Sequence, residues 1–412
     1  MKNNNKKAML RPDPAESLNG LIAVCLAAAA ALFIIWTFTG KWPWVGQYYN
    51  SYILQAQSWL DGRLDLGQNY SHLEIAIFDG KYYISFPPFP SYLMLPFVFL
   101  GWDTCDGFIA FVSAIAAGAY AFKILEHFGI EKDRAVFFAL FLTIGSNWLF
   151  TAQVAWVWFI AQNMAFTLSL MAIYYALKGK AGLSLFVWAC AVGCRPFNAL
   201  YIPVLLYLLY RQHMDENPND TVKDIIRKRW KAVIPMAVIA ISYMVLNYAR
   251  FGNPIEFGHN YLPEHTESEK GQFDPSYILS NIPALFRLPK ISFDGAWEYQ
   301  AFNGTCMFLV SPIFVSCVVY GARHIMKSDK RGRILPLLVL AVVIIHLLAL
   351  TAHNTMGGSQ FGNRYTNDVL PMAFLGLAIS LPKDSKWDKF NYVLFVIGLT
   401  LNAIGSVLYY TK

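Results

Sequence analysis

The sequence predicts an all-α polytopic membrane protein. Of its 412 residues, 56% are hydrophobic and only 14% are charged, which is more apolar surface than one water-soluble core of this size buries. The apolar residues also form runs long enough to cross a hydrocarbon layer of about 30 Å. The first run, residues 18–40, lacks a small-residue cleavage site, so we expect a retained helix there and not a signal peptide.

About eleven apolar segments are candidates for transmembrane helices. They cover residues 18–40, 107–126, 135–152, 155–177, 182–195, 196–210, 232–250, 304–322, 334–352, 366–382 and 390–410. One more apolar segment, residues 86–101, contains four prolines. Proline at this density disfavours a regular spanning helix, so we expect this segment to lie at the membrane interface.

The basic residues set the expected orientation. If residues 86–101 do not cross, most of the 33 lysines and arginines fall on the side of the N-terminus. If residues 86–101 cross instead and residues 182–210 form one span, fewer of these lysines and arginines lie on the side of the N-terminus. Lysine and arginine favour the cytoplasmic side, so we expect a protein of the plasma (inner) membrane with a cytoplasmic N-terminus. Two large loops, residues 41–106 and 251–303, are then extracytoplasmic.

The first of these loops is expected to carry interfacial helices. Trp42 and Trp44 are typical of anchors at a membrane interface. Residues 48–60 place apolar side chains at helical spacing, with glutamines opposite, and Gly62 supplies the helix stop. No internal repeat is evident, so we expect residues 1–412 to form a single membrane domain that includes both loops.

Cofactor signals are weak. The six cysteines lie mostly inside apolar runs without CxxC spacing, which argues against zinc or a disulfide framework. No Gly-rich phosphate loop joins a strand to a helix, and no metal-ligand cluster stands out. We therefore predict no cofactor, with a divalent metal left as an open alternative. Membrane lipids are expected partners, and nucleic acid is not.

A charged aromatic turn leads into the proline-rich segment, where residues 78–90 read FDGKYYISFPPFP. The order of elements, a basic N-terminus, one span, a loop with this turn and then many spans, resembles the integral-membrane GT-C glycosyltransferases. Bacterial aminoarabinose transferase and protein O-mannosyltransferases carry a turn similar to residues 82–88. An uncharacterised bacterial branch of this superfamily is similar at residues 61–66, 248–258 and 360–365.

This resemblance implies a GT-C-like fold and a glycosyltransferase. The enzyme would move a hexosyl or pentosyl group from a polyprenyl-phosphate sugar donor to a glycan, lipid or protein acceptor of the envelope, with inversion expected. Such chemistry needs a carboxylate that accepts the acceptor's proton. It also needs cations that hold the lipid phosphate while charge builds on the leaving oxygen.

The catalytic base is the point at which this chain departs from the family. Many members carry an acidic pair soon after the first span, whereas residues 45–50 here read VGQYYN, and glutamine cannot act as a base. Glu74 is the favoured candidate because its apolar flanks would raise its pKa. Asp61 and Asp65 are alternatives, although turn or capping roles suit them. An ordinary loop acid at Glu74, or a catalytically silent relative, remains open.

Two arginines are the leading candidates for binding the lipid phosphate. Arg195 interrupts an apolar stretch between two short spans, where a charge without a partner is costly. Arg364 follows a glycine-rich stretch that lets backbone N–H groups approach a phosphate. Pairing with a loop carboxylate is the alternative for Arg195, and a helix-end anchor is the alternative for Arg364. The turn adds further candidates for the same headgroup region: Lys81, Tyr82 and Tyr83.

Several polar residues are candidates for an acceptor or sugar pocket: His353, Asn354, Gln360 and Gln162. The aromatic residues between 148 and 159 suit either an interfacial belt or a face that packs on a sugar ring.

Two rival functions remain. A transporter or lipid flippase is also a helical bundle with buried charges, and a non-catalytic envelope assembly protein needs no base. An outward-facing cavity that contains Glu74, Lys81, Arg195 and Arg364 together would favour sugar transfer.

Overall fold

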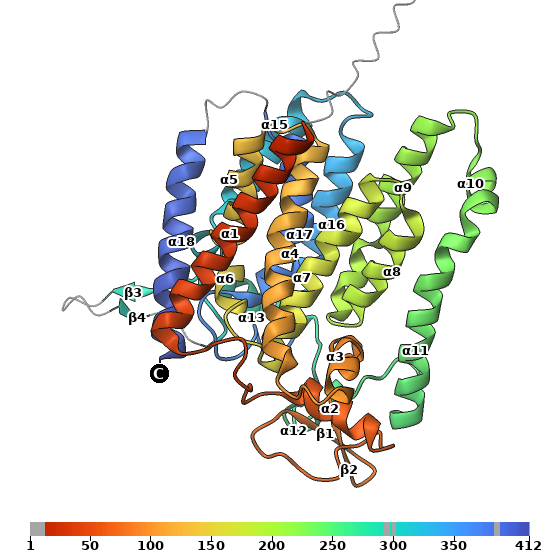
Figure 1. The fold of residues 1–412 in the computed structure, drawn as a ribbon, viewed down its shortest axis with the longest axis vertical. Helices are drawn as coiled ribbons and strands as arrows, with labels where there is room; N and C mark the ends of the chain where they lie inside the picture. The colour runs from red at the N-terminus through yellow and green to blue at the C-terminus, as the bar shows by residue number, and fades with distance from the viewer. Residues whose placement is uncertain (1–12, 292–296, 299–301, 383–387, 412) are drawn as a thin grey trace, which may run out of the picture.

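The computed structural model describes residues 13–291, 297–298, 302–382 and 388–411. Helices run side by side along one axis, and irregular segments gather at one end of the bundle (Figure 1). Six of the described helical segments are long and apolar enough to cross a membrane. They are α1 (Pro14–Thr39), α4 (Cys105–His127), α7 (Val157–Leu177), the segment Val222–Phe251, α16 (Ile334–Thr351) and α18 (Asp388–Tyr410).

Shorter helices complete the bundle. They are α5 (Lys132–Leu142), α6 (Trp148–Thr151), α8 (Ala181–Val192), α9 (Ile202–Glu216), α14 (Met307–Val310), α15 (Ile313–Lys327) and α17 (Leu370–Ser380). The segment Val222–Phe251 consists mostly of two helices, α10 (Val222–Arg229) and α11 (Ile234–Phe251). Short 3-10 turns precede three of them: η1 (Pro196–Tyr201), η2 (Trp230–Val233) and η5 (Arg364–Asp368). Some expected spans are therefore divided, because residues 135–152 and 304–322 each form two helices.

The break between α5 and α6 allows a close helix contact. A Cβ atom on Gly398 of α18 would lie 2.1 Å from the carbonyl oxygen of Gly145, so only glycine fits there. Beyond the break, the buried Asn147 accepts a hydrogen bond from the N–H of Asn363 and donates one to the carbonyl of Phe361. The break therefore anchors the segment that leads into η5.

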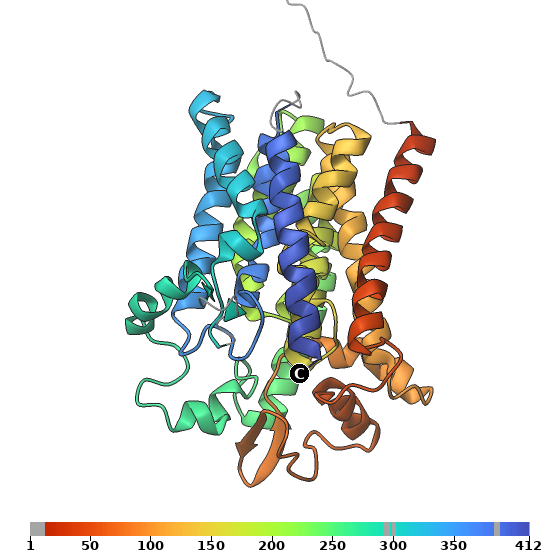
Figure 2. The same cartoon turned by 90° about the vertical axis from the view of Figure 1, so that its left-hand side faces the viewer.

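The two long connections lie at the same end of the bundle (Figure 1, Figure 2). The first contains α2 (Ser51–Leu60), β1 (Ile75–Phe78), β2 (Lys81–Ile84) and α3 (Phe89–Phe99). The second contains η3 (His259–Tyr261), α12 (Pro263–Thr266), α13 (Ser276–Asn281), η4 (Ile282–Leu285), β3 (Lys290–Ile291) and β4 (Trp297–Glu298). The basic turn between α15 and α16 and the connection from α9 to the basic helix α10 lie at the opposite end.

The predicted all-α class holds for most of the chain, and the described residues add two short two-stranded antiparallel sheets that the prediction did not include. β1 pairs antiparallel with β2, and Phe78 lies opposite Lys81. Between them, Asp79 and Gly80 have φ angles of 49° and 69°, as a tight two-residue hairpin turn requires. Lys81 is therefore exposed at the hairpin tip, while Ile84 at the other end of β2 is buried.

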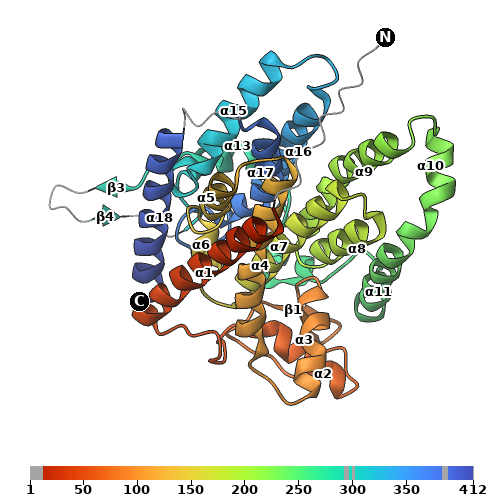
Figure 3. The same ribbon diagram turned by 45° about the horizontal axis from the view of Figure 1, so that its top comes forward.

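The amphipathic helix expected at residues 48–60 is α2, and it packs against α3 (Figure 3). Gln55, expected on the polar face, is buried and accepts a hydrogen bond from Ser91 Oγ of α3 at 2.8 Å. Gly62 follows the helix with a φ of 74°, as predicted. α3 has only 11 residues, which is too short to cross a bilayer.

α7 is the central helix of the bundle. In its most apolar window 78% of the residues are buried, compared with 6% in the segment Val222–Phe251, which stands at the edge (Figure 1). α7 packs mainly on α4 and α8. Its first turn lies at the end of the bundle that carries the long connections, so it offers a rigid support for a site there.

Candidate active site

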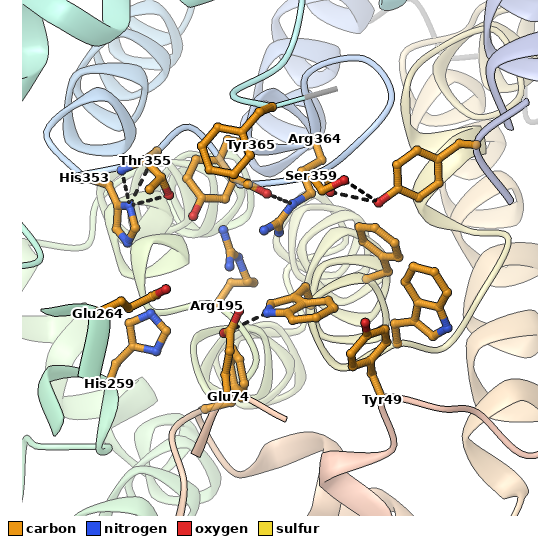
Figure 4. Close-up of a pocket in the computed structure, with 18 residues that line it drawn as sticks. Tyr49, Glu74, Arg195, His259, Glu264, His353, Thr355, Ser359, Arg364 and Tyr365 are labelled. Carbon is orange, nitrogen blue, oxygen red and sulfur yellow. Dashed lines mark hydrogen bonds between the residues drawn. The ribbon is translucent and has the colours of Figure 1, made fainter. Parts of the chain in front are cut away.

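A cavity of about 610 Å³ opens at the end of the bundle that carries the long connections. Segments far apart in the chain build its wall: the first loop, the first turn of α7, the bend after α8, the second loop and the stretch between α16 and α17. Figure 4 shows their side chains converging. The charged and histidine side chains in the wall are Glu74, Arg195, His259, Glu264, His353 and Arg364.

Glu74 stands just before β1 and lines the cavity. Its Oε2 accepts a hydrogen bond from Trp158 Nε1 at 2.9 Å, drawn as a dashed line in Figure 4. Burial raises the pKa of Glu74 to about 7, although the hydrogen bond from Trp158 opposes this shift. A carboxyl group with this pKa exchanges its proton near neutral pH, as a general base requires.

Arg195 lies at the bend between α8 and η1 and is held by a buried carboxylate. Its Nε and Nη2 both donate to Asp368 Oδ2, at 3.0 and 2.6 Å. Gln162 Nε2 donates to the other oxygen of Asp368 at 2.6 Å. This bonding fixes the direction of the guanidinium group. Arg195 Nη1 makes no hydrogen bond to the described residues, so it remains available to a ligand in the cavity.

Arg364 is held by neutral groups and forms no salt bridge with the described carboxylates. Its Nε donates to the carbonyl oxygen of Gly357 at 2.9 Å, and its backbone N–H donates to Gln360 Oε1 at 2.6 Å. The ring centre of Tyr365 lies 4.9 Å from its guanidinium carbon. Its buried Nη1 has no hydrogen-bond partner among the described residues. Because such a group is costly to leave unpaired, it points to an anionic ligand.

Gly357 makes this arrangement possible. Its φ angle is 102°, and a Cβ atom there would lie 2.9 Å from Gln360 Nε2 and 3.1 Å from Arg364 Nε. Any side chain would displace the two groups that orient the arginine. The glycine-rich stretch thus holds Arg364 through a carbonyl oxygen, whereas the sequence suggested that its backbone N–H groups approach a phosphate.

The two alternative bases do not line the cavity. Asp61 is exposed at the end of α2, and its Oδ2 lies 2.9 Å from Arg63 Nη2. Asp65 Oδ1 accepts the backbone N–H of Gly67 at 2.8 Å, which is a turn-stabilising role. Of the first-loop acids proposed as the base, the structure brings only Glu74 to the arginines.

The three candidates from the aromatic turn also lie outside the cavity wall. Lys81 is exposed at the hairpin tip. Tyr83 is buried against Phe251, with ring centres 5.2 Å apart, and Tyr82 packs against the apolar core of the first loop. The hairpin explains this outcome, because successive side chains in a strand point to opposite faces.

The four candidates for the acceptor or sugar pocket divide into two groups. His353 lines the cavity, and Asn354 contacts His265 beside it, with Nδ2 3.1 Å from Nδ1. Gln360 and Gln162 are fully buried behind the wall. Gln162 Nε2 donates to the backbone carbonyl of Arg364 at 2.7 Å, so both glutamines position arginines and neither touches the cavity.

Sequence reasoning missed Asp368, His259 and Glu264. A signal existed for Asp368, since it is the sole acid in residues 366–382 and Arg195 is the sole base in its own apolar stretch. Charges within apolar segments usually pair with one another. The second loop gave no such signal for His259 or Glu264, because many other polar and charged residues surround them in the sequence.

A smaller apolar cavity of about 290 Å³ adjoins the first. The two share part of their walls: Phe86, Trp158, Arg195, His259, His353 and Tyr365. The rest of the smaller wall is mainly apolar and includes Phe197, Phe273 and Leu350. A charged cavity beside an apolar one suits a ligand with an anionic head and a hydrocarbon tail.

A solved protein structure has a similar architecture. ArnT from Cupriavidus metallidurans, determined with bound undecaprenyl phosphate, matches with a TM-score of 0.51 over 94% of this chain and 75% of ArnT, at 13% sequence identity. The chain has the fold of ArnT. The GT-C-like fold expected from the order of elements is therefore confirmed, and with its membrane-length helices it is that of an integral membrane protein.

A second solved structure matches less well. The archaeal oligosaccharyltransferase AglB from Archaeoglobus fulgidus, determined with an inhibitory peptide and a dolichol-phosphate, has a TM-score of 0.45 and 14% identity. The match covers 95% of this chain and 56% of AglB. No family model and no curated protein sequence matches the chain.

Proposed function

We propose that this chain transfers a sugar from a polyprenyl-phosphate-linked donor to an acceptor of the cell envelope. The convergence of the first-loop carboxyl group of Glu74 with the two guanidinium groups of Arg195 and Arg364 on a single cavity carries this proposal. The fold adds support, since ArnT was solved with undecaprenyl phosphate bound. The adjoining apolar cavity offers space for the isoprenoid carbons nearest the phosphate.

The proposed reaction is a single displacement. The hydroxyl oxygen of the acceptor attacks the anomeric carbon, and the bond from that carbon to the phosphate oxygen breaks. Glu74 takes the proton of the hydroxyl group. Polyprenyl phosphate leaves with the electron pair, and Arg195 and Arg364 stabilise its increasing negative charge. Attack from the side opposite the phosphate inverts the configuration of the anomeric carbon.

Aromatic residues give the sugar ring a surface to pack on. Tyr49, Trp156 and Phe159 all line the cavity, and the rings of Trp156 and Phe159 are stacked at 5.7 Å. The apolar face of a sugar ring packs favourably on the face of an aromatic ring. Tyr49 belongs to residues 45–50, so the stretch that lacks the family's acidic pair still reaches the cavity.

We also propose that the cavity faces the outside of the cell and that the chain crosses the membrane about eleven times. α1 begins at the end opposite the long connections, and α18 ends at the same end as those connections (Figure 1). An odd number of crossings follows from that arrangement. The basic turn between α15 and α16 lies at the end of the bundle where α1 begins, as the preference of cations for the cytoplasm requires.

Cysteine labelling tests this orientation. Lys270 of the second loop and Lys228 of α10 are both exposed lysines, which makes them a matched pair. A membrane-impermeant thiol reagent on intact cells is expected to label Lys270→Cys and to leave Lys228→Cys unlabelled until the cells are opened. Labelling of Lys228→Cys in intact cells would overturn the orientation.

Lipid release separates transfer from transport. Membranes that contain the protein are given a labelled polyprenyl-phosphate sugar and an extract of envelope acceptors. Transfer frees polyprenyl phosphate and moves the label to the acceptor, and both products are expected to require Glu74. A flippase would instead move the intact lipid-linked sugar across the bilayer without breaking the sugar–phosphate bond.

The pH dependence of the rate follows from the pKa of Glu74. The base works only when deprotonated, so kcat should rise with pH through a midpoint near 7, the raised pKa of this carboxyl group. Trp158→Phe removes a hydrogen bond that favours the charged form, so its midpoint should lie at higher pH. A midpoint that stays in place in Trp158→Phe would contradict the assignment of Glu74 as the base.

A further inference from the structure

Three histidines from two separate segments meet at the edge of the cavity. One ring nitrogen from each of His259, His265 and His353 lies within 4.8 Å of those of the other two. His259 and His353 line the cavity, and Figure 4 shows them on the same side of it, next to Glu264. The displacement reaction described above uses none of these three rings.

The main chain holds the two segments together. The N–H of Asp274 donates to the carbonyl of Ala352 at 3.0 Å, and the N–H of Asn354 donates to the carbonyl of Gln272 at 2.9 Å. These bonds dock the second loop on the chain that follows α16. His353 lies between Ala352 and Asn354, the two residues that make these bonds, so backbone pairing places it against the second loop.

Hydrogen bonds to the main chain leave one nitrogen free on two of the rings. His259 Nδ1 lies 3.2 Å from the carbonyl oxygen of Ser85, so Nδ1 carries the proton and Nε2 keeps a lone pair. His353 Nδ1 lies 2.9 Å from the carbonyl oxygen of Thr355 and 3.1 Å from its N–H. The Thr355 N–H donates to Nδ1, so when Nε2 binds a ligand the proton moves to Nδ1, where the Thr355 carbonyl oxygen accepts it. Bonds of this kind orient metal-binding histidines and raise their basicity.

His265 gives the clearest sign of a ligand. Its ring is buried, and its Nε2 makes no hydrogen bond to the described residues, although Glu264 Oε1 lies 3.4 Å away. The side-chain oxygen of Asn354 is also unpaired, although the Asn354 nitrogen lies 3.1 Å from His265 Nδ1. Oxygen and nitrogen of an amide are assigned from such contacts. Turning the amide over pairs its oxygen with a protonated Nδ1 and leaves a lone pair on Nε2.

The charges around the cluster suit a cation bound by neutral rings. Burial lowers the pKa of His259 to about 3 and that of His353 to about 4, and it lowers the pKa of His265 as well. All three rings are therefore neutral at pH 7, the form that binds metals. Glu264 Oε1 lies 3.4 Å from His265 Nε2 and brings a negative charge to the cluster, while the positive charges of Arg195 and Arg364 act on His353.

We propose that His259, His265 and His353 bind a divalent metal ion of the zinc class, with its remaining coordination position open to the cavity. Zinc binds imidazole nitrogens at about 2.0–2.1 Å in tetrahedral geometry, which sets the nitrogens roughly 3.3 Å apart. The widest separation, 4.8 Å, must then shrink by roughly 1.5 Å. The open position takes an oxygen ligand, such as a phosphate oxygen of a substrate.

The test measures metal binding without any substrate. The full chain is purified in nanodiscs with its affinity tag removed and stripped with a chelator. It is then titrated with Zn²⁺, followed by elemental analysis, and with Co²⁺, followed by its visible absorption. We expect one bound ion per chain and a Co²⁺ spectrum typical of four-coordinate nitrogen and oxygen ligands. Less than one ion at saturation would overturn the proposal.

Variants assign the ion to the three rings. His265→Gln and His353→Gln should each lower Zn²⁺ affinity by more than about 100-fold, because loss of a supporting hydrogen bond alone costs about 10- to 100-fold. Asn354→Ala should fall in that smaller range. His72→Gln, which changes an exposed histidine of the first loop, is the matched control and should bind as the wild type does. Wild-type affinity in both ligand variants would overturn the proposal.

The melting temperature, measured with and without Zn²⁺, distinguishes loss of metal binding from loss of folding. Zn²⁺ should raise the Tm of the wild type and of His72→Gln, because a ligand that binds only the folded state stabilises it. His265→Gln and His353→Gln should melt at the same temperature with and without Zn²⁺. An equal rise in Tm in these variants would place the ion elsewhere. None of these measurements uses a sugar donor, so their failure would leave the proposed transfer reaction untouched.

Discussion

Replacing Glu74 by glutamine is expected to lower the rate of sugar transfer by about 10²–10⁴-fold, with the affinity for polyprenyl phosphate nearly unchanged. Glutamine keeps the shape of the side chain, and its oxygen can still accept the Trp158 N–H that now lies 2.9 Å from Oε2. It cannot take a proton from the acceptor. The measurement compares kcat and polyprenyl phosphate binding of the two proteins in nanodiscs.

Asp61→Asn and Asp65→Asn are the matched controls, because they neutralise carboxylates of the same loop that do not line the cavity. Both are expected to transfer sugar at the wild-type rate. If Glu74→Gln is active while either control is inactive, the base belongs at the end of α2. If all three variants match the wild type, none of these three carboxylates is the base. That result would favour a transporter or a non-catalytic assembly protein.

Stability provides an independent check on Glu74. Its pKa in the folded protein, about 7, lies above the ordinary value of 4.5, so the folded state binds more protons than the unfolded state between these values. Stability is therefore lost as the pH rises from about 4.5 through about 7. Glu74→Gln should be at least as stable as the wild type at pH 8, and this advantage should disappear at pH 4. A glutamate with only a structural role would show the opposite order at pH 8.

Arg364→Ala is expected to weaken polyprenyl phosphate binding by about 1.5–3 kcal/mol, the range of a hydrogen bond to a charged group, which is roughly 10- to 150-fold in Kd. Its Nη1 is buried without a partner among the described residues, so a phosphate oxygen is the group that the substitution loses. Titration of the nanodisc-bound protein with undecaprenyl phosphate measures the effect. Unchanged affinity would remove Arg364 from the phosphate site.

Two further variants sharpen this result. Arg63→Ala removes an exposed arginine of the first loop and should bind polyprenyl phosphate normally. Arg195→Ala should weaken binding as well, but it also leaves Asp368 buried without its partner, which costs stability. Arg364→Ala therefore separates binding from folding better than Arg195→Ala does.

Strong local signals in the sequence predicted much of the bundle. Long apolar runs correspond to α1, α4, α7, α16 and α18, and the proline-rich segment forms the short α3 beside α2. The hairpin of β1 and β2 was missed although a signal existed, since an Asp-Gly pair between two alternating apolar segments is typical of a hairpin. That error also misplaced Lys81, whose position depends on strand geometry.

The site was predictable only where one residue was conspicuous by itself. Glu74, Arg195 and Arg364 are charges with apolar or glycine-rich neighbours, and the structure brings them to one cavity, while their roles stay predictions. Asp368 belongs to the site because it pairs with Arg195, which lies 173 residues away in the sequence. His259 and His353 likewise meet through backbone pairing between separate loops, which no spacing motif in one segment reveals.

The ion pair of Arg195 and Asp368 has a consequence for the order in which the protein is made. Ribosomes add about 5–20 residues per second, so roughly 9–35 s separate the synthesis of the two partners. During that time Arg195 has to remain hydrated, because a charge without a partner is costly within lipid. α8 is only 12 residues long, which keeps Arg195 at a turn and out of a full-length span. Arg195, between α8 and α9, can therefore stay in contact with water until α17 is synthesised and Asp368 becomes available to pair with it. A nascent chain released before that point would contain Arg195 without its acidic partner.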